Sequence, residues 1–197
     1  MRAQRICVYC GSSDKSNSIY YDAARKMGEV LAGRSITLVY GGGGTGMMGI
    51  LADAVLESGG QVIGVIPELF DTPALVHRGL TELQVVGSMH ERKARMVEIA
   101  DAFIALPGGF GTFEELFEIL TWSQIGLHRK PIGILNVDSY FDPLLALIDH
   151  ARSEGFIYSE HTDLLINGNE PAELLDRIEA YTLPTGLDRW VHRKEGP

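Results

Sequence analysis

The sequence contains few cysteines, an excess of acidic over basic residues, and no long hydrophobic run. Its two cysteines, Cys7 and Cys10, lie in the same apolar segment, and there is no second pair to complete a zinc site. Residues three positions apart on a strand point to opposite faces, so a disulfide between them is not expected. We therefore expect two buried free thiols in a reducing compartment.

The absence of a signal peptide, and of any apolar stretch near about 18 residues, predicts a cytoplasmic protein with no membrane segment. A net charge of −9 at pH 7 argues against a nucleic-acid-binding surface. It still allows a small anionic substrate, because local N–H groups and arginines can override the average field. With 197 residues, of which 45% are hydrophobic, the composition suits one globular domain.

Strand-like apolar runs alternate with helical patterns along the chain. Strands are expected at residues 5–10, 37–40, 61–66, 83–86, 102–106, 131–135 and 164–166. Helices are expected at residues 19–32, 46–58, 89–100, 112–125, 143–153 and 171–181. This alternation predicts an α/β fold: one Rossmann-like domain over residues 1–182, with a doubly wound parallel sheet in three αβα layers. Residues 183–197 are predicted to form a polar tail that frays.

Three loops follow predicted strands: Gly11-Ser12-Ser13, the glycines at 41–44, and the segment 107–111. Ligands bind beyond the carboxyl ends of such strands, so Ser13 and Gly43 are candidate binding residues. Residues 41–49 fit the GxGxxG fingerprint of dinucleotide-binding proteins, but so glycine-rich a segment fits it in many registers. The fingerprint also needs an acidic residue about 20 positions later, and the sequence offers only Glu68, which lies further on than expected. We interpret them as a nucleotide platform, or as tight strand–helix packing, rather than as a site for NAD or FAD.

The most informative segment is PGGFGTFEE at residues 107–115. Its glycines let backbone approach an anion, and the helix that follows points free N–H groups at it. Thr112 is expected to cap that helix and to donate to a phosphate oxygen. Glu114 and Glu115 are expected in the first turn, about 100° apart, so only one can face the ligand fully. The alternative reading is that both merely supply favourable charge to the helix.

The segment 88–95 predicts a helix that begins with a capping box formed by Ser88 and Glu91. Basic side chains near a helix N-terminus indicate that an anion binds there. Arg92 can form two parallel hydrogen bonds to a phosphate or carboxylate. Arg95 lies one turn further along the helix and is expected on the same face as Arg92. The alternative is that both arginines belong to a basic face exposed to solvent. Met89 and Trp122 are core residues or else cover a flat base.

Several separated motifs resemble one known family. Residues 107–115 are similar to the PGGxGTxxE signature of the Lonely Guy family, which are cytokinin riboside 5′-monophosphate phosphoribohydrolases. The resemblance spans about residues 5–170. Its other motifs are at residues 10–13, 40–43, 46–49, 64–67, 89–93 and 121–122.

The resemblance implies a Rossmann-like homodimer with sites near the subunit interface, and hydrolysis of the N-glycosidic bond of a nucleoside 5′-monophosphate without metal or redox cofactor. The implied catalytic pair is Arg92 and Glu115. The implied phosphate and substrate contacts are Gly108, Gly109, Gly111, Thr112, Lys93, Glu114 and Thr121. Family members often carry an acid in the loop after the Ile-Pro; here the matching stretch is Thr72-Pro73-Ala74-Leu75, so that contact is not assigned.

Two alternatives to nucleotide hydrolysis are a decarboxylase and a non-catalytic carrier. A lysine decarboxylase would need pyridoxal phosphate on a lysine, and Lys93 has no acid placed for the pyridine nitrogen. A nucleotide-binding or molybdenum-cofactor carrier on the same scaffold would bind without releasing base. The presence of both Arg92 and Glu115 favours the enzyme over the carrier.

Overall fold

The computed structural model describes residues 3–187, and seven parallel strands form one sheet in the order β4-β3-β2-β1-β5-β6-β7. The strands are β1 (Arg5–Tyr9), β2 (Thr37–Tyr40), β3 (Val62–Pro67), β4 (Glu82–Val86), β5 (Ala102–Ala105), β6 (Ile132–Leu135) and β7 (Leu165–Gly168). The chain moves outward from β1 in one direction and, from β5 on, in the other. The doubly wound parallel sheet predicted from the sequence is confirmed.

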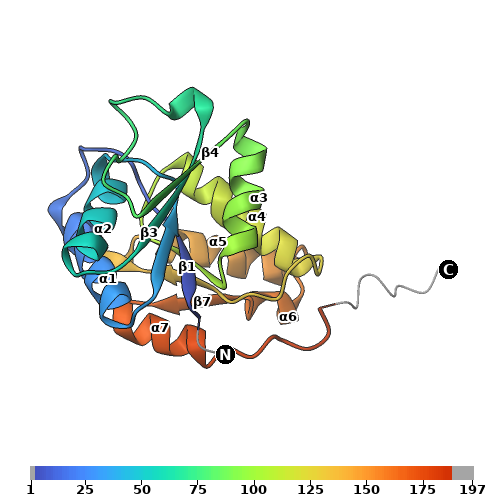
Figure 1. The fold of residues 1–197 in the computed structure, drawn as a ribbon. Coiled ribbons are helices and arrows are strands. Elements are labelled where there is room, and N and C mark those ends of the chain that lie inside the picture. The colour runs from blue at the N-terminus through green and yellow to red at the C-terminus, as the bar shows by residue number, and fades with distance from the viewer. Residues whose placement is uncertain (1–2, 188–197) are drawn as a thin grey trace.

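Helices cover both faces of the sheet, giving three layers (Figure 1). One face carries α1 (Ser18–Gly33), α2 (Gly46–Glu57) and α7 (Pro171–Glu179), and the other carries α3 (Met89–Ile99), α4 (Phe110–Gln124) and α5 (Asp142–Ser153). The remaining elements are the short helix α6 (Ser159–Thr162) and the 3₁₀ turns η1 (Glu68–Phe70) and η2 (Val137–Ser139). The connection from β3 to β4 projects beyond the carboxyl end of the sheet (Figure 1).

Two apolar cores result from the alternation of side chains along the strands. In β1, Ile6 and Val8 pack with α1, α2 and α7, whereas Cys7 and Tyr9 pack with α3, α4 and α5. Cys10 belongs to the first core, so the two cysteines do lie on opposite faces, and both are free and buried. Burial raises the pKa of both thiols far above the ordinary value.

Most predicted elements lie within a few residues of the observed ones. The clearest difference is α4, which begins at Phe110 rather than at Thr112. The four-residue α6 was not predicted, because it is too short to show a helical period. Residues 188–197 of the predicted tail lie outside the described residues. Within residues 3–187, no helix has the length and apolar character needed to cross a membrane.

The close packing of α1 on α2 depends on Gly28, which is fully inside that interface. A Cβ added there would lie 2.7 Å from Ala54 Cβ and 2.8 Å from the Leu51 carbonyl oxygen. Both neighbours belong to α2, so the two helices would have to move apart. Gly33, at the end of the same helix, has no atom within 4 Å of its added Cβ.

We therefore expect Gly28→Ala to lower the free energy of unfolding by about 1–3 kcal/mol relative to Gly33→Ala, because overpacking outweighs the better helix propensity of alanine. Urea denaturation of the two variants measures the difference. Equal stabilities would show that the α1–α2 interface is looser than described.

Candidate active site

The candidate site lies where the strand order reverses, between β1 and β5. The loops that leave these strands touch: the Gly11 N–H donates to the Pro107 carbonyl at 3.1 Å. A Cβ at Gly11 would lie 3.3 Å from the Gly108 Cα, so the close approach requires small residues. A cavity of about 650 Å³ opens at this point, as expected for a doubly wound sheet.

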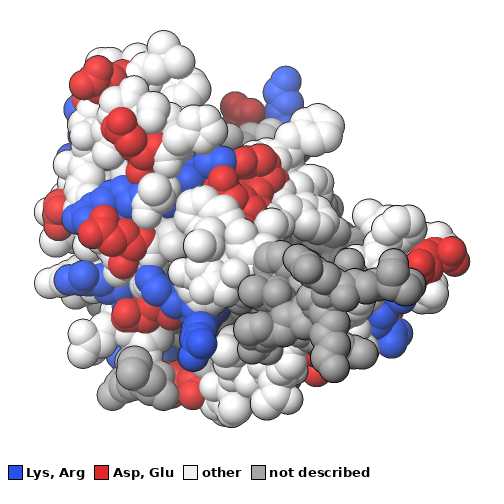
Figure 2. Space-filling view, turned by 90° about the vertical axis from the view of Figure 1, so that its right-hand side faces the viewer, with Lys and Arg blue, Asp and Glu red and all other residues white. Residues whose placement is uncertain are grey.

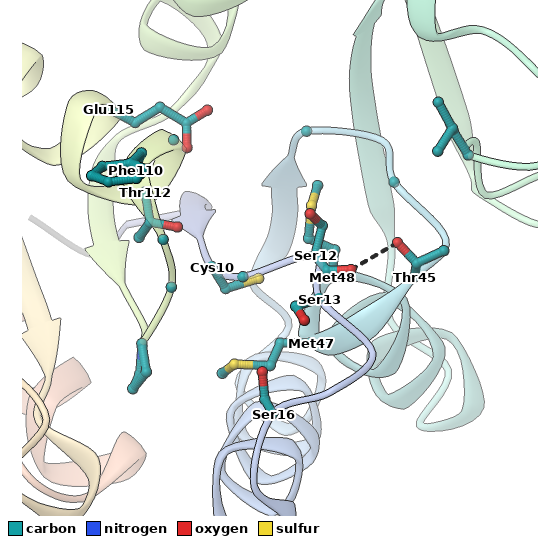
Figure 3. Close-up of a pocket in the computed structure, with 18 of the residues that line it drawn as sticks. Cys10, Ser12, Ser13, Ser16, Thr45, Met47, Met48, Phe110, Thr112 and Glu115 are labelled. Carbon is teal, nitrogen blue, oxygen red and sulfur yellow. Dashed lines mark hydrogen bonds between the residues drawn. The ribbon is translucent and has the colours of Figure 1, made fainter.

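The cavity lies between α4 on one side and the loops that lead into α1 and α2 on the other (Figure 3). Its polar lining includes Ser12, Ser13, Ser16, Tyr20, Thr45, Thr112 and Tyr140. Its apolar lining includes Met47, Met48, Ile66, Pro67, Phe70, Leu75 and Met89. Thr45 donates to the Ser12 carbonyl at 3.0 Å and so ties the two loops together (Figure 3).

Helix α4 presents its N-terminus to this cavity. Gly109 is the N-cap, in an extended conformation, and it forms no side-chain capping bond. The first helical bond in this turn runs from the Phe113 N–H to the Gly109 carbonyl, which leaves the amides ahead of it available to a ligand. A Cβ at Gly108 would collide with Thr112 Oγ1, so this loop position needs glycine.

Two expectations about this helix were wrong. Thr112 is buried at the third position of α4, so it is not the N-cap. Glu114 and Glu115 consequently lie beyond the first turn. The physical reason is that Gly109, without a side chain, tolerates the N-cap position and lets Phe110 and Gly111 begin the helix.

Arg92 and Glu115 form an ion pair across the cavity wall. Arg92 Nη1 lies 2.6 Å from Glu115 Oε1, and each side chain is only 11% exposed. Arg92 Nε also donates to the Val65 carbonyl at 3.1 Å, which fixes the guanidinium plane. A Cβ at Gly41 would collide with this guanidinium, so the residue that follows β2 must be a glycine for Arg92 to fit.

The start of α3 places Arg92 here. Ser88 accepts from the Glu91 N–H at 3.2 Å, and the Glu91 carboxylate accepts from the Gly87 N–H at 2.8 Å. The predicted cap is thus present, although Glu91 reaches Gly87 rather than Ser88. Arg95, one turn on from Arg92, does not line the cavity and instead bonds Gln84 and Glu98.

Two opposing electrostatic effects act on the carboxyl of Glu115. Burial raises the pKa of its carboxyl above the ordinary value, and the Arg92 guanidinium offsets part of that rise by charge and hydrogen bonding. Glu114 adds a smaller rise. The net direction is upward, because the loss of solvation outweighs the stabilisation that Arg92 gives to the charged form.

A second ionic group, outside the cavity, joins α3 to α4. Lys93 is buried and binds Glu114 and, at 2.9 Å, Glu118. Burial alone would lower the pKa of Lys93, but the bonds to the two carboxylates raise it overall. The side of the molecule shown in Figure 2 carries acidic and basic residues interleaved rather than separated by sign.

Nine of the predicted site residues line the cavity: Ser13, Gly43, Met89, Arg92, Gly108, Gly109, Gly111, Thr112 and Glu115. Lys93, Glu114, Thr121 and Trp122 are not part of the lining formed by the described residues. Thr121 instead donates back to the Phe117 carbonyl at 2.7 Å, and Trp122 is half-buried.

Sequence reasoning missed the role of Tyr140, Tyr20 and Ser16 in the lining. Tyr20 lies inside the helix expected at residues 19–32, and Tyr140 has no motif around it. Leu75 also lines the cavity, because its carbonyl accepts from the Gly44 N–H at 2.8 Å and folds the loop over the glycines. Ala74 beside it is exposed and supplies no carboxylate.

Known proteins resemble this chain in sequence and in fold. The family model described as "Possible lysine decarboxylase" matches residues 48–178. A rice (Oryza sativa subsp. japonica) protein named cytokinin riboside 5′-monophosphate phosphoribohydrolase LOG is 49% identical over 91% of this chain and 74% of its own. Its Arabidopsis thaliana counterpart LOG2 is 47% identical over 91% of this chain and 84% of its own. The chain belongs to the Lonely Guy (LOG) family.

Solved structures share the fold at lower identity. The molybdenum cofactor binding protein of Rippkaea orientalis is 20% identical, with a TM-score of 0.69 over 91% of this chain and 98% of that chain. The molybdenum cofactor carrier protein of Chlamydomonas reinhardtii is 18% identical, with the same TM-score and coverage. At this identity the likeness establishes the Rossmann-like architecture of this LOG-family protein and nothing about its ligand.

We expect the Glu115 carboxyl to titrate above the ordinary glutamate pKa of about 4.3, and to titrate higher still in Arg92→Met, because the guanidinium favours the charged form. NMR of the glutamate carboxyl carbons during a pH titration measures both midpoints. Arg95→Met is the control, since Arg95 does not contact Glu115. A lower midpoint in Arg92→Met would contradict the assigned pairing.

Proposed function

We propose that this protein hydrolyses the N-glycosidic bond of nucleoside 5′-monophosphates, releasing an adenine-type base and ribose 5-phosphate. The observation that carries the proposal is a buried Arg92–Glu115 pair in the same cavity as the N-terminus of α4. Relatives named as phosphoribohydrolases at 47–49% identity support it.

The 5′-phosphate would bind at the N-terminus of α4. Gly109, Gly111 and Thr112 lie there, and the backbone N–H groups of a first helical turn suit an anion. Ser13 and Gly43 face the same cavity from the opposite loops. The phosphate would thereby supply binding energy that positions the ribose against the reacting groups.

Glu115 would act on the anomeric carbon. Lengthening of the C–N bond builds positive charge on the ribose, and a carboxylate can stabilise that charge or activate the attacking water. Water then adds to the anomeric carbon, while the base departs with the bonding electrons and takes up a proton. Arg92 would hold Glu115 ionised and oriented through its charge-assisted hydrogen bond.

The base would occupy the apolar part of the lining. Met48, Ile66 and Met89 offer apolar contact to a flat ring, while Leu75 and Phe70 come from the connection between β3 and β4. We propose an adenine-type base without choosing between adenine and an N6-prenylated form. Ala74 leaves the loop without the acidic side chain expected there.

We expect adenosine 5′-monophosphate to be cleaved and adenosine to be cleaved far less well. Glu115→Gln should lower kcat by about 10²–10⁴-fold while retaining binding, because the amide cannot stabilise charge or accept a proton. Chromatographic detection of free base measures turnover. Glu118→Gln is the matched control, since Glu118 lies on the same helix and pairs with Lys93 instead of Arg92.

Two results would contradict the proposal. Wild-type turnover retained in Glu115→Gln would remove the carboxylate from the mechanism. Tight binding of the monophosphate without any release of base by the wild type would favour the nucleotide-binding carrier instead.

We also propose that the protein is a cytoplasmic homodimer with its sites near the subunit interface. An apolar stripe follows α4 and the turn after it: Phe110 is 94% exposed, Phe117 42%, Ile125 41% and Leu127 67%. Phe110 and Phe117 are seven residues, about two turns, apart and share one face of the helix. Phe110 also lines the cavity, so a partner covering this stripe would reach the site.

Phe117→Asp is expected to convert the dimer to a monomer, because a charge would be buried in the apolar contact. Sedimentation equilibrium measures the mass. The control is Ile19→Asp, of similar exposure on α1 at the opposite face of the sheet. A dimer that persists in Phe117→Asp would place the interface elsewhere.

A further inference from the structure

Tyr140 makes a contact that the family resemblance did not assign. It follows η2 at the carboxyl end of β6 and lines the cavity. Its hydroxyl donates to the Gly108 carbonyl at 2.5 Å, across 32 positions of sequence. Gly108 immediately precedes the N-cap of α4, so the bond acts on the loop where we propose that phosphate binds.

The Tyr140 ring is held in place on several sides. It stacks on Phe113 of α4 with centroids 6.4 Å apart and planes 17° apart. Tyr20 of α1 packs edge-on at 5.6 Å, and the fully buried Phe141 packs edge-on at 5.1 Å. The phenol therefore has a fixed direction independent of its hydroxyl bond.

The backbone before Tyr140 is also unusual. Asp138 and Ser139 are consecutive non-glycine residues with φ of 50° and 58°. Such conformations persist where neighbouring structure enforces them, and they gather at functional sites. The Asn136 side chain spans this turn: it donates to Asp142 and accepts from the Phe141 N–H, both at 2.7 Å.

We propose that Tyr140 is a positioning residue that aims the phosphate-binding amides of the glycine loop. The argument rests on the proposed function and on the rigidity of the peptide unit. In a planar trans peptide the carbonyl of one residue and the N–H of the next point in opposite directions. By holding the Gly108 carbonyl, Tyr140 also fixes the direction of the Gly109 N–H.

The proposal assigns Tyr140 to the phosphate and not to the base or the reacting bond. Its loss should therefore weaken ligands that carry a phosphate and spare those that do not. A purely structural role would weaken both kinds of ligand together. That difference makes the hydroxyl testable separately from the aromatic ring.

The test compares Tyr140→Phe, which keeps the ring and removes the hydroxyl, with Tyr181→Phe, whose phenol lies outside the cavity lining. Both are made in the Glu115→Gln background, so that binding is measured without turnover. Calorimetric titration with adenosine 5′-monophosphate and with adenosine gives the dissociation constants. Thermal unfolding of each variant checks that the fold is retained.

We expect Tyr140→Phe to bind adenosine 5′-monophosphate about tenfold more weakly, the loss of one positioned hydrogen bond, and to bind adenosine unchanged. With Glu115 restored, KM for the monophosphate should rise while kcat stays nearly constant. Equal weakening of both ligands, or no weakening of either, would overturn the proposal. Failure of the wild type to release base would refute the proposed function and leave this binding comparison intact.

Discussion

The site depends on one buried ion pair. Arg92 on α3 and Glu115 on α4 neutralise each other inside the cavity wall, where an unpaired charge would be costly. The pair imposes requirements on its surroundings: Gly41 must lack a side chain, and the Val65 carbonyl must face the guanidinium. This one contact therefore involves α3, α4, the residue after β2 and the middle of β3.

The proposed chemistry places a carboxylate in a site that also binds a phosphate, and two negative charges repel. Helix α4 separates them. Gly109 caps the helix and Glu115 lies six residues further along, about 9 Å up the helix axis. The amides would bind the phosphate at the helix end, while Arg92 balances the carboxylate. One helix would therefore carry both proposed functions without placing the charges in contact.

The sequence was a good guide where local physics decides the structure. Short buried strands, the Ser88 cap and glycine loops after strands predicted the sheet and the convergence of the loops. It was a poorer guide where several segments meet. The start of α4 depended on Gly109 taking the N-cap position without a capping side chain, and the turn of Arg95 toward Gln84 depended on β4. Tyr140 is distant in sequence from the loop it contacts, so no motif could reveal it.

The most direct test of the account is a crystal structure of the Glu115→Gln variant with adenosine 5′-monophosphate bound. We predict phosphate oxygens within hydrogen-bonding distance of the Gly109, Gly111 and Thr112 amides, and the anomeric carbon facing residue 115. A phosphate bound away from the start of α4, or a ribose turned away from residue 115, would contradict the account.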